Sequence, residues 1–246
     1  MKQGLSNIID KIADIKGKHW LEKSLNGLQP EKRIPYFVEN VFHPSWAGMC
    51  PRYIQYIYLG IVTQEAEDAR VERIFDVGHH THIRYKNYFE RLGILIGTEV
   101  GVDIKLPENL FIKGRADFLL KSPEEERIVV ELKSINNNAF EKLKAPVDEH
   151  FLQWNMYAQQ LSHEGIILYE NKNNQFLKVF PVSFIQTKFD YVVNIFRQVR
   201  DCSQKGILVF KPEKCPNAYC KGKVLCKEGK KELNEFKLEF RNKKGQ

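Results

Sequence analysis

The spacing of hydrophobic residues predicts a chain that alternates between helices and strands. Apolar runs of strand length occur at 95–105, 110–120, 127–134, 165–170 and 176–182. Patterns typical of helices occur at 5–25, 47–63, 66–92, 148–162 and 183–204. Strands flanked by helices in this order predict an α/β fold with a mixed central sheet.

The second and third predicted strands carry the polar residues of greatest chemical interest. Residues 121–127 between them are polar and predict a tight turn that joins two neighbouring strands. Asp117 lies near the end of the first of these strands, and Glu131 and Lys133 lie on the next one. Because side chains alternate between the two faces of a strand, Glu131 and Lys133 point to one face and Leu132 to the other.

These groups suit the hydrolysis of a phosphodiester with a divalent cation. Mg²⁺ and Mn²⁺ prefer oxygen ligands, which Asp117, Glu131 and the carbonyl of Leu132 would supply. The metal would lower the pKa of a bound water, and Lys133 would hold that water or stabilise the charge that develops on the phosphate. The alternative is a solvent-exposed sheet face, where Glu-x-Lys pairs are common and carry no chemistry.

Two of the predicted helices add polar residues. The helix that follows the three strands carries Gln153 and Tyr157 four residues apart, so they share one face. The helix that precedes the strands carries Gly78, and His82 completes a Gly-x-x-x-His motif with it. His79 lies about one turn before His82 and is the alternative ligand. An imidazole ligand would favour Mn²⁺ over Mg²⁺.

Taken in order, Gly-x-x-x-His, Gly-x-x-Asp, Glu-x-Lys and Gln-x-x-x-Tyr resemble the motifs of the RecB-like branch of the PD-(D/E)xK nucleases. The resemblance implies a restriction-endonuclease-like core. It implies the metal ligands His82, Asp117, Glu131 and the carbonyl of Leu132. It also implies an active site formed by Asp117, Glu131, Lys133, Gln153 and Tyr157, in which Lys133 assists the water and the last two orient the DNA backbone. Ala116 stands before Asp117, where the superfamily's name has proline.

The cysteines narrow the resemblance. Cys215, Cys220 and Cys226 form a C-x4-C-x5-C run, and Cys50 lies 165 residues before it in a Cys-Pro-Arg sequence. This arrangement resembles the iron–sulfur staple of the Cas-four exonucleases of CRISPR systems, their phage homologues and the AddB-type helicase–nucleases. The resemblance implies that these four cysteines bind a [4Fe–4S] cluster; tetrahedral Zn²⁺ or no metal are the alternatives. Cys202 could replace one of these ligands, but it lies in a helical stretch, which favours an ordinary small buried residue.

The whole chain is interpreted as one nuclease domain. Its predicted parts are a helical segment at 1–92, a catalytic core at 93–182, a helix and cysteine loop at 183–227 and a basic tail at 228–246. The formal net charge of +7 suits a polyanionic partner. No run approaches 18 apolar residues and the N-terminus lacks the pattern of a signal peptide, so we expect a cytoplasmic protein without a membrane partner.

The predicted function is that of a metal-dependent deoxyribonuclease, with an exonuclease acting 5′→3′ on single-stranded DNA favoured by the resemblance. Its expected context is recombination, repair or the processing of CRISPR or phage DNA. A protein partner is expected there, such as a recombinase or a CRISPR integrase. The alternatives are an accessory DNA-binding subunit that passes DNA ends to such a partner, and a structure-specific endonuclease.

Overall fold

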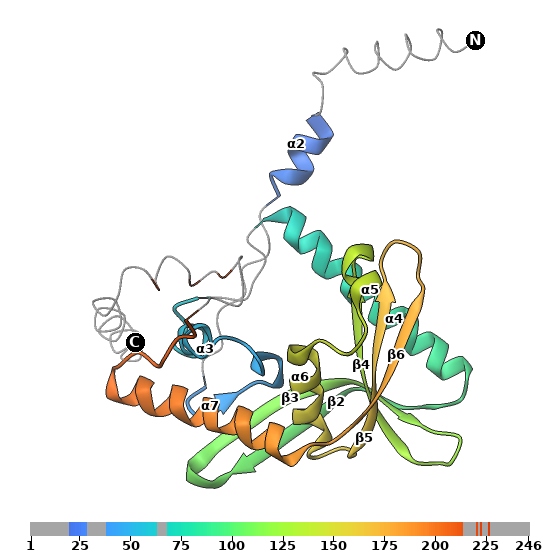
Figure 1. The fold of residues 1–246 in the computed structure, drawn as a ribbon. Helices are drawn as coiled ribbons and strands as arrows, with labels where there is room; N and C mark the ends of the chain where they lie inside the picture. The colour runs from blue at the N-terminus through green and yellow to red at the C-terminus, as the bar shows by residue number, and fades with distance from the viewer. Residues whose placement is uncertain are drawn as a thin grey trace, which may run out of the picture. The chain divides into compact units, whose positions relative to one another are not determined.

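The computed structural model describes residues 20–28, 38–62, 68–213, 220, 222 and 226 (Figure 1). These residues fall into two compact units. The first comprises 20–28 and 68–80, and the second comprises the other described residues. Helix α2 (Trp20–Asn26) and the first part of α4 (Ala69–Arg91) belong to the first unit, where Arg73 hydrogen-bonds the side chain of Asn26 at 2.9 Å. Every candidate active-site residue described below lies in the second unit.

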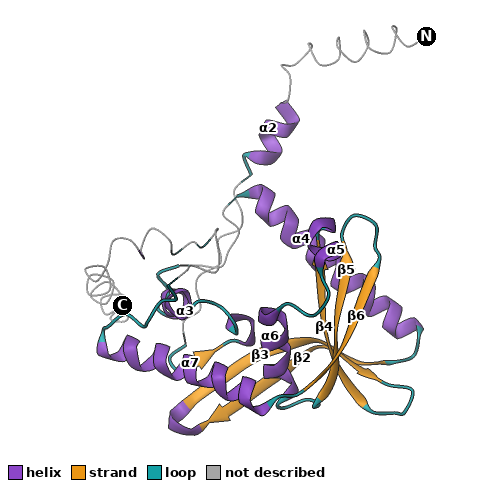
Figure 2. Ribbon diagram, in the orientation of Figure 1, coloured by secondary structure: helices purple, strands orange, loops and turns teal. Residues whose placement is uncertain are grey.

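A six-stranded mixed sheet forms the centre of the second unit (Figure 2). Its strands are β1 (Val41–Phe42), β2 (Leu95–Leu106), β3 (Leu110–Lys121), β4 (Arg127–Ile135), β5 (Glu164–Asn171) and β6 (Leu177–Ser183). They pair in the order β1-β3-β4-β5-β6, and β2 pairs with β3. The β1–β3 and β4–β5 pairs are parallel and the others are antiparallel. The prediction of an α/β fold with a mixed sheet is therefore confirmed.

Helices cover both faces of this sheet. They are α3 (Pro51–Tyr58), α5 (Asn137–Lys142), α6 (Asp148–Ala158), α7 (Gln186–Lys205) and the second part of α4, with short 3-10 helices η1 (Pro44–Trp46) and η2 (Pro107–Asn109). Helix α6 packs Trp154 and Tyr157 against one face, and α4 packs Tyr85 and Phe89 against the other. A third apolar cluster joins α3, α7, β1 and the start of β3.

The predicted element boundaries differ from the observed ones where local chemistry stops an element early. The helix predicted at 47–63 begins at Pro51, a residue suited to the first helical turn, and the chain leaves it at Gly60 with a φ of 70°. The helix predicted at 148–162 ends at Ala158. Strand β1 and helix α5 are too short to give a periodic signal in the sequence. The N-terminal helix predicted at 5–25 lies outside the described residues up to residue 19, and so does the basic tail.

Strands β3 and β4 pair over only part of their length. Their ladder joins residues 118–121 to residues 127–130 and stops at Phe118 and Val130. Beyond that pair, β4 continues beside β5 as far as Ile135, whereas the start of β3 pairs with β1. We call the place where β3 and β4 separate the strand fork. Beyond the Phe118–Val130 pair no ladder joins the described residues of β3 and β4, so backbone groups between the two strands can bond to side chains instead.

Trp154 fixes α6 to the sheet beside the strand fork. Its indole is fully buried, and Nε1–H donates a hydrogen bond of 3.0 Å to the carbonyl of Val129. The indole lies over Gly165 of β5, where a Cβ atom would be 2.5 Å from Nε1 and 2.2 Å from the Val129 oxygen. Because neither backbone nor indole leaves room for a side chain at residue 165, α6 approaches β4 closely at this point.

Candidate active site

Asp117 lies at the strand fork and takes the place of a missing strand partner. Its Oδ2 accepts a hydrogen bond of 2.8 Å from the backbone N–H of Leu132, two residues past the last ladder pair on β4. Burial raises the pKa of Asp117, while the Leu132 N–H and the Lys133 charge oppose that rise. The N–H and the C=O of one strand residue point to the same edge, so the carbonyl of Leu132 also faces the strand fork.

Glu131 and Lys133 project from the α6 face of β4, and the side chain of Leu132 is buried on the α4 face. Only 1% of the Glu131 side chain is exposed, and Lys133 Nζ lies 2.6 Å from its Oε1. Neither oxygen of Glu131 accepts a hydrogen bond of normal geometry. Burial raises the pKa of Glu131 and the Asp117 carboxylate raises it further, although Lys133 lowers it. Two acidic groups therefore share one buried region with a single amine.

Helix α6 supplies the partners of Lys133. The ammonium of Lys133 donates a hydrogen bond of 3.1 Å to Oε1 of Gln153. Nε2 of Gln153 in turn donates a hydrogen bond of 3.0 Å to the hydroxyl of Tyr157. Burial acts to lower the pKa of Lys133, but the charge and hydrogen bond of Glu131 together with the Asp117 carboxylate outweigh it, so the pKa is raised and the amine stays charged. The two α6 residues of the Gln-x-x-x-Tyr motif thus hold the lysine in one orientation.

His82 reaches the strand fork from the opposite face of the sheet. Its Nδ1 lies 3.6 Å from Oδ1 of Asp117. The second part of α4 is anchored to β5 through Glu170, which accepts hydrogen bonds from Arg84 and from the hydroxyl of Tyr85 (2.8 Å). His79 is exposed and belongs to the first unit, so of the two alternative ligands the structure brings His82 to Asp117.

The described structure shows no packing contact that would require a glycine at position 78. A Cβ atom at this position would meet nothing within 4 Å, so space does not require a glycine there. A glycine within a helix costs about 1 kcal/mol relative to alanine, and no close contact at Gly78 offsets that cost among the described residues. The Gly-x-x-x-His motif therefore contributes to the site through its histidine.

Glu99 of β2 is a site residue that the sequence did not reveal. Donor atoms of His82, Glu99 and Asp117 all lie within 4.8 Å of one another, close enough to share one metal ion. Glu99 falls opposite Asp117 between the Thr98–Phe118 and Val100–Ala116 pairs, with a left-handed φ of 48°. Like charges opposite each other on neighbouring strands repel, and Glu99 raises the pKa of Asp117. A cation between these groups would remove that repulsion.

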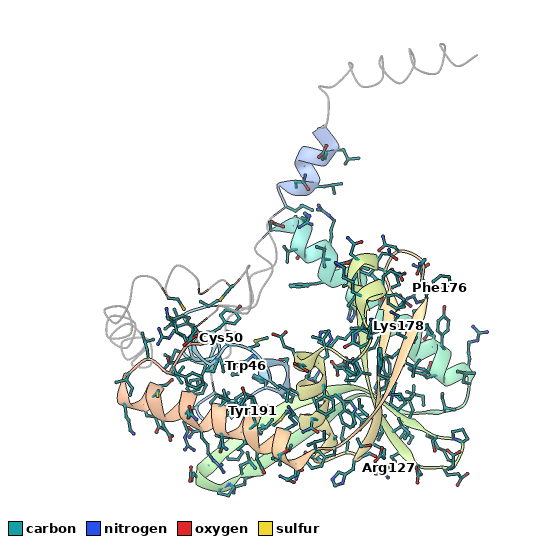
Figure 3. All side chains as sticks on the ribbon, in the orientation of Figure 1. Trp46, Cys50, Arg127, Phe176, Lys178 and Tyr191 are labelled. Atoms are coloured by element: carbon teal, nitrogen blue, oxygen red, sulfur yellow. The ribbon has the colours of Figure 1, made fainter. Side chains whose placement is uncertain are left out.

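The cysteines are only partly described. Cys215 lies outside the described residues. Cys50 precedes the first residue of α3 (Figure 3), and Sγ of Cys226 lies 3.9 Å from the hydroxyl of Tyr56 on the same helix. Gly222 also packs on Tyr56, with an added Cβ only 2.8 Å from its ring. The structure therefore brings part of the late cysteine run to the helix that begins at Cys50.

Two further predictions concern cysteine and the membrane. Cys202 lies half-buried in α7 against the third apolar cluster, as expected of an ordinary packing residue. Among the described residues, the side chains close enough to share one metal ion are His82, Glu99 and Asp117. No group of the described cysteines meets that condition. No helix in the described part of the chain is long and apolar enough to cross a membrane.

Comparison with known proteins gives a fold. No family model matches the chain, and no curated protein matches it by sequence. The crystal structure of SSO0001 is 20% identical, with a TM-score of 0.53 over 84% of this chain and 91% of that chain. The two chains share a fold. The crystal structure of LHK-Exo in complex with dAMP is 16% identical over 63% of this chain and 82% of that chain, and its TM-score of 0.43 is too low to support an argument.

Proposed function

We propose that this protein is a divalent-metal-dependent deoxyribonuclease. The observation that carries the proposal is the strand fork, where the carboxylates of Asp117 and Glu131 meet and the ammonium of Lys133 lies 2.6 Å from Glu131. A structural ion pair would need one acid and one base. Here two buried acids of raised pKa surround one amine, an arrangement typical of a functional site.

The side chains fit a hard divalent cation. Glu131 has two buried oxygens without normal hydrogen bonds, and Asp117 has one oxygen bound to Leu132 N–H and the other near His82. Asp117, Glu131, His82 and the carbonyl of Leu132 would hold the ion, with Glu99 as an additional ligand. A bound Mg²⁺ or Mn²⁺ would lower the pKa of a water and neutralise charge on the phosphate. The imidazole favours Mn²⁺.

The α6 side of the strand fork supplies the other groups. Lys133 is held by Glu131 and Gln153, so its ammonium is positioned to stabilise negative charge on the phosphate or to orient the attacking water. Tyr157 fixes the amide of Gln153, which in turn fixes Lys133. We infer that Gln153 and Tyr157 also contact the DNA backbone, as their counterparts do in the RecB-like nucleases that the motifs resemble.

The substrate is proposed to be single-stranded DNA, degraded from an end in the 5′→3′ direction within recombination, repair or CRISPR and phage DNA processing. The net charge of +7 supports a polyanionic substrate. The order of motifs along the chain, similar to that of the Cas-four exonucleases, supports an exonuclease in a cytoplasmic compartment. One domain spanning the chain and a recombinase or integrase partner belong to the same proposal.

We further propose that Cys50, Cys215, Cys220 and Cys226 bind a [4Fe–4S] cluster. Contacts of Cys226 and Gly222 with Tyr56 of α3 support it, because they bring the late run near Cys50. Anaerobic purification should yield a coloured protein with iron and sulfide, and Cys50→Ala should lose both. Cys202→Ala is the matched control. If the purified protein contains zinc and no iron, the four cysteines bind zinc and the cluster proposal is wrong.

The decisive experiment compares wild-type protein with Asp117→Asn on end-labelled single-stranded DNA in the presence of Mn²⁺. We expect short products from the wild type and none from the variant. Asp103→Asn is the control, since the side chain of Asp103 is exposed and pairs with the exposed Lys113 at 2.8 Å. Binding without turnover in Mn²⁺ or Mg²⁺ would favour the accessory DNA-binding subunit. Cleavage of closed circular single strands would favour the endonuclease.

A further inference from the structure

His150 lies on the same face of α6 as the two residues that hold Lys133. It precedes Gln153 by three residues and Tyr157 by seven, a spacing that places all three along one helical stripe. Gln153 contacts Lys133 directly. His150 is therefore one helical turn from the candidate active site, although none of the motifs includes it.

A second contact fixes His150 beside Lys133. Tyr169 of β5 pairs with Lys133 in the parallel β4–β5 ladder, so these two side chains leave the sheet as neighbours on one face. The Tyr169 side chain is fully buried, and its hydroxyl lies 2.9 Å from Nδ1 of His150. The sheet register and the helix spacing thus lead independently to the same position for the imidazole.

The hydrogen bonds of Tyr169 determine which nitrogen of His150 carries a proton. The Tyr169 hydroxyl already accepts a hydrogen bond of 3.0 Å from the backbone N–H of Val147. Its single proton then needs an acceptor in a buried environment, and Nδ1 of His150 is the acceptor at hand. A neutral ring that accepts at Nδ1 has its hydrogen on Nε2.

The ring is neutral at physiological pH. Burial lowers the pKa of His150 to about 4, and the nearby charge of Lys133 contributes. Nε2 has no hydrogen-bond partner among the described residues. The hydrogen bond from Tyr169 fixes the orientation of the His150 ring, so Nε2–H is a neutral donor near Lys133. Such a donor is suited to bind one oxygen of a phosphate.

We propose that His150 is a substrate-binding residue, which donates Nε2–H to a phosphate oxygen of the nucleic acid beside Lys133. This inference rests on the proposed nuclease function. A second cation here would compete with Lys133 for Glu131, whereas an uncharged donor adds a contact to the phosphate and leaves the Lys133–Glu131 ion pair intact. His150 thus sets where the phosphate lies, and Lys133 supplies the charge.

The test compares wild type, His150→Phe and His150→Gln in cleavage of single-stranded DNA at pH 7.5. His150→Phe keeps the ring volume and removes the donor, so KM should rise or kcat/KM fall about 10- to 100-fold, the usual worth of a hydrogen bond to a charged group. His150→Gln should recover part of the loss through its amide N–H. Cleavage by His150→Phe at the wild-type kcat/KM would overturn the proposal.

The salt dependence of binding separates a neutral contact from a charged one. A protonated histidine would release a counterion, and its loss would reduce the slope of log K against log salt by about 0.7 for a single strand. We expect the same slope for wild type and His150→Phe. A reduced slope in the variant would contradict a neutral donor.

A spectroscopic measurement on wild-type protein avoids any folding defect of the variants. Nitrogen-15 NMR of the histidine side chains at pH 7 should show His150 as the Nε2–H tautomer, and an Nδ1–H tautomer or an imidazolium would overturn the proposal. If the wild type does not cleave DNA, the nuclease proposal fails. Binding of single-stranded DNA by wild type and His150→Phe then decides the role of His150, with equal affinity counting against it.

Discussion

The two sides of the strand fork are built differently. On the α6 side, Lys133, Gln153 and Tyr157 form a continuous chain of contacts that holds the amine without a ligand. On the α4 side, His82, Glu99 and Asp117 bring donor atoms within 4.8 Å of one another, and the two carboxylates repel. The difference shows a site in which the amine is held in place by the protein, whereas the carboxylates need a cation to balance them.

A large effect on the cleavage rate is expected from removing the amine on the α6 side. Lys133→Ala should reduce the cleavage rate about 10²- to 10³-fold, the usual cost of losing a group that stabilises transition-state charge. The fold should survive because Glu131, whose pKa is already raised, can take up a proton. Steady-state cleavage assays with circular dichroism as a folding check would measure this.

Lys121→Ala is the control for that experiment, because Lys121 is half exposed and pairs with the exposed Glu125 at 2.9 Å. It should cleave as the wild type does. Mn²⁺-dependent cleavage by Lys133→Ala at an undiminished rate would remove the amine from the mechanism and break the comparison.

Asp117→Asn should abolish cleavage and yet stabilise the metal-free protein. The folded-state pKa of Asp117 is raised, so its charge destabilises the fold above that pKa and has no effect below the unfolded-state pKa. Through Asp117, the metal-free wild type should thus lose stability as the pH rises from about 4 to about 6, and the loss should persist at pH 8. The amide still accepts the Leu132 N–H, and the gain at pH 8 should be about 1–3 kcal/mol.

Thermal unfolding at pH 4 and pH 8, with EDTA or with Mn²⁺, would measure this difference. Mn²⁺ should raise the melting temperature of the wild type and leave that of Asp117→Asn nearly unchanged. A metal-free variant that is less stable than the wild type at pH 8 would mean that the α4 side is already balanced.

Glu99→Gln tests whether the metal site on the α4 side includes a ligand from β2. It should weaken Mn²⁺ binding roughly 10-fold, comparable to the loss of a group that supports a metal ligand. Isothermal titration with Mn²⁺ would measure the change. Glu90→Gln is the control, since Glu90 is exposed on α4 and pairs with Lys86. Unchanged affinity in Glu99→Gln would place Glu99 outside the metal site.

Tyr157→Phe should have the smallest effect on cleavage, because it removes only the hydrogen bond between Gln153 and Tyr157 and leaves Lys133 in contact with Gln153. Gln153 would lose the acceptor of its Nε2–H, at a cost of about 1 kcal/mol in unfolding free energy. Cleavage should fall less than in Lys133→Ala. Chemical denaturation and cleavage assays would measure both, with the exposed Tyr88→Phe as the control. A loss as large as that of Lys133→Ala would give Tyr157 a direct catalytic role.

Much of the α6 side was predictable from local pattern. The period of two along β4 placed Glu131 and Lys133 on one face of the strand. The spacing of four placed Gln153 and Tyr157 on one face of helix α6. The polar turn at 121–127 predicted the pairing of β3 with β4. These signals are local, so one sequence was enough to reveal them.

Glu99 and His150 depended on long-range strand register, which one sequence does not contain. Glu99 lies opposite Asp117 with a left-handed φ of 48° in mid-strand, a conformation that is uncommon for any residue other than glycine. His150 faces Lys133 because Tyr169 pairs with that lysine across two parallel strands. The [4Fe–4S] assignment stays a prediction, since Cys215 lies outside the described residues.

The lack of room for a side chain at residue 165 limits how this protein can vary. Any side chain there would displace the indole of Trp154, and Gln153, next to it in the helix, would shift away from Lys133. An activity screen of random variants would thus score this glycine as intolerant as the charged residues, although no substrate touches it. A map of mutational tolerance read without the structure would count it as part of the chemistry.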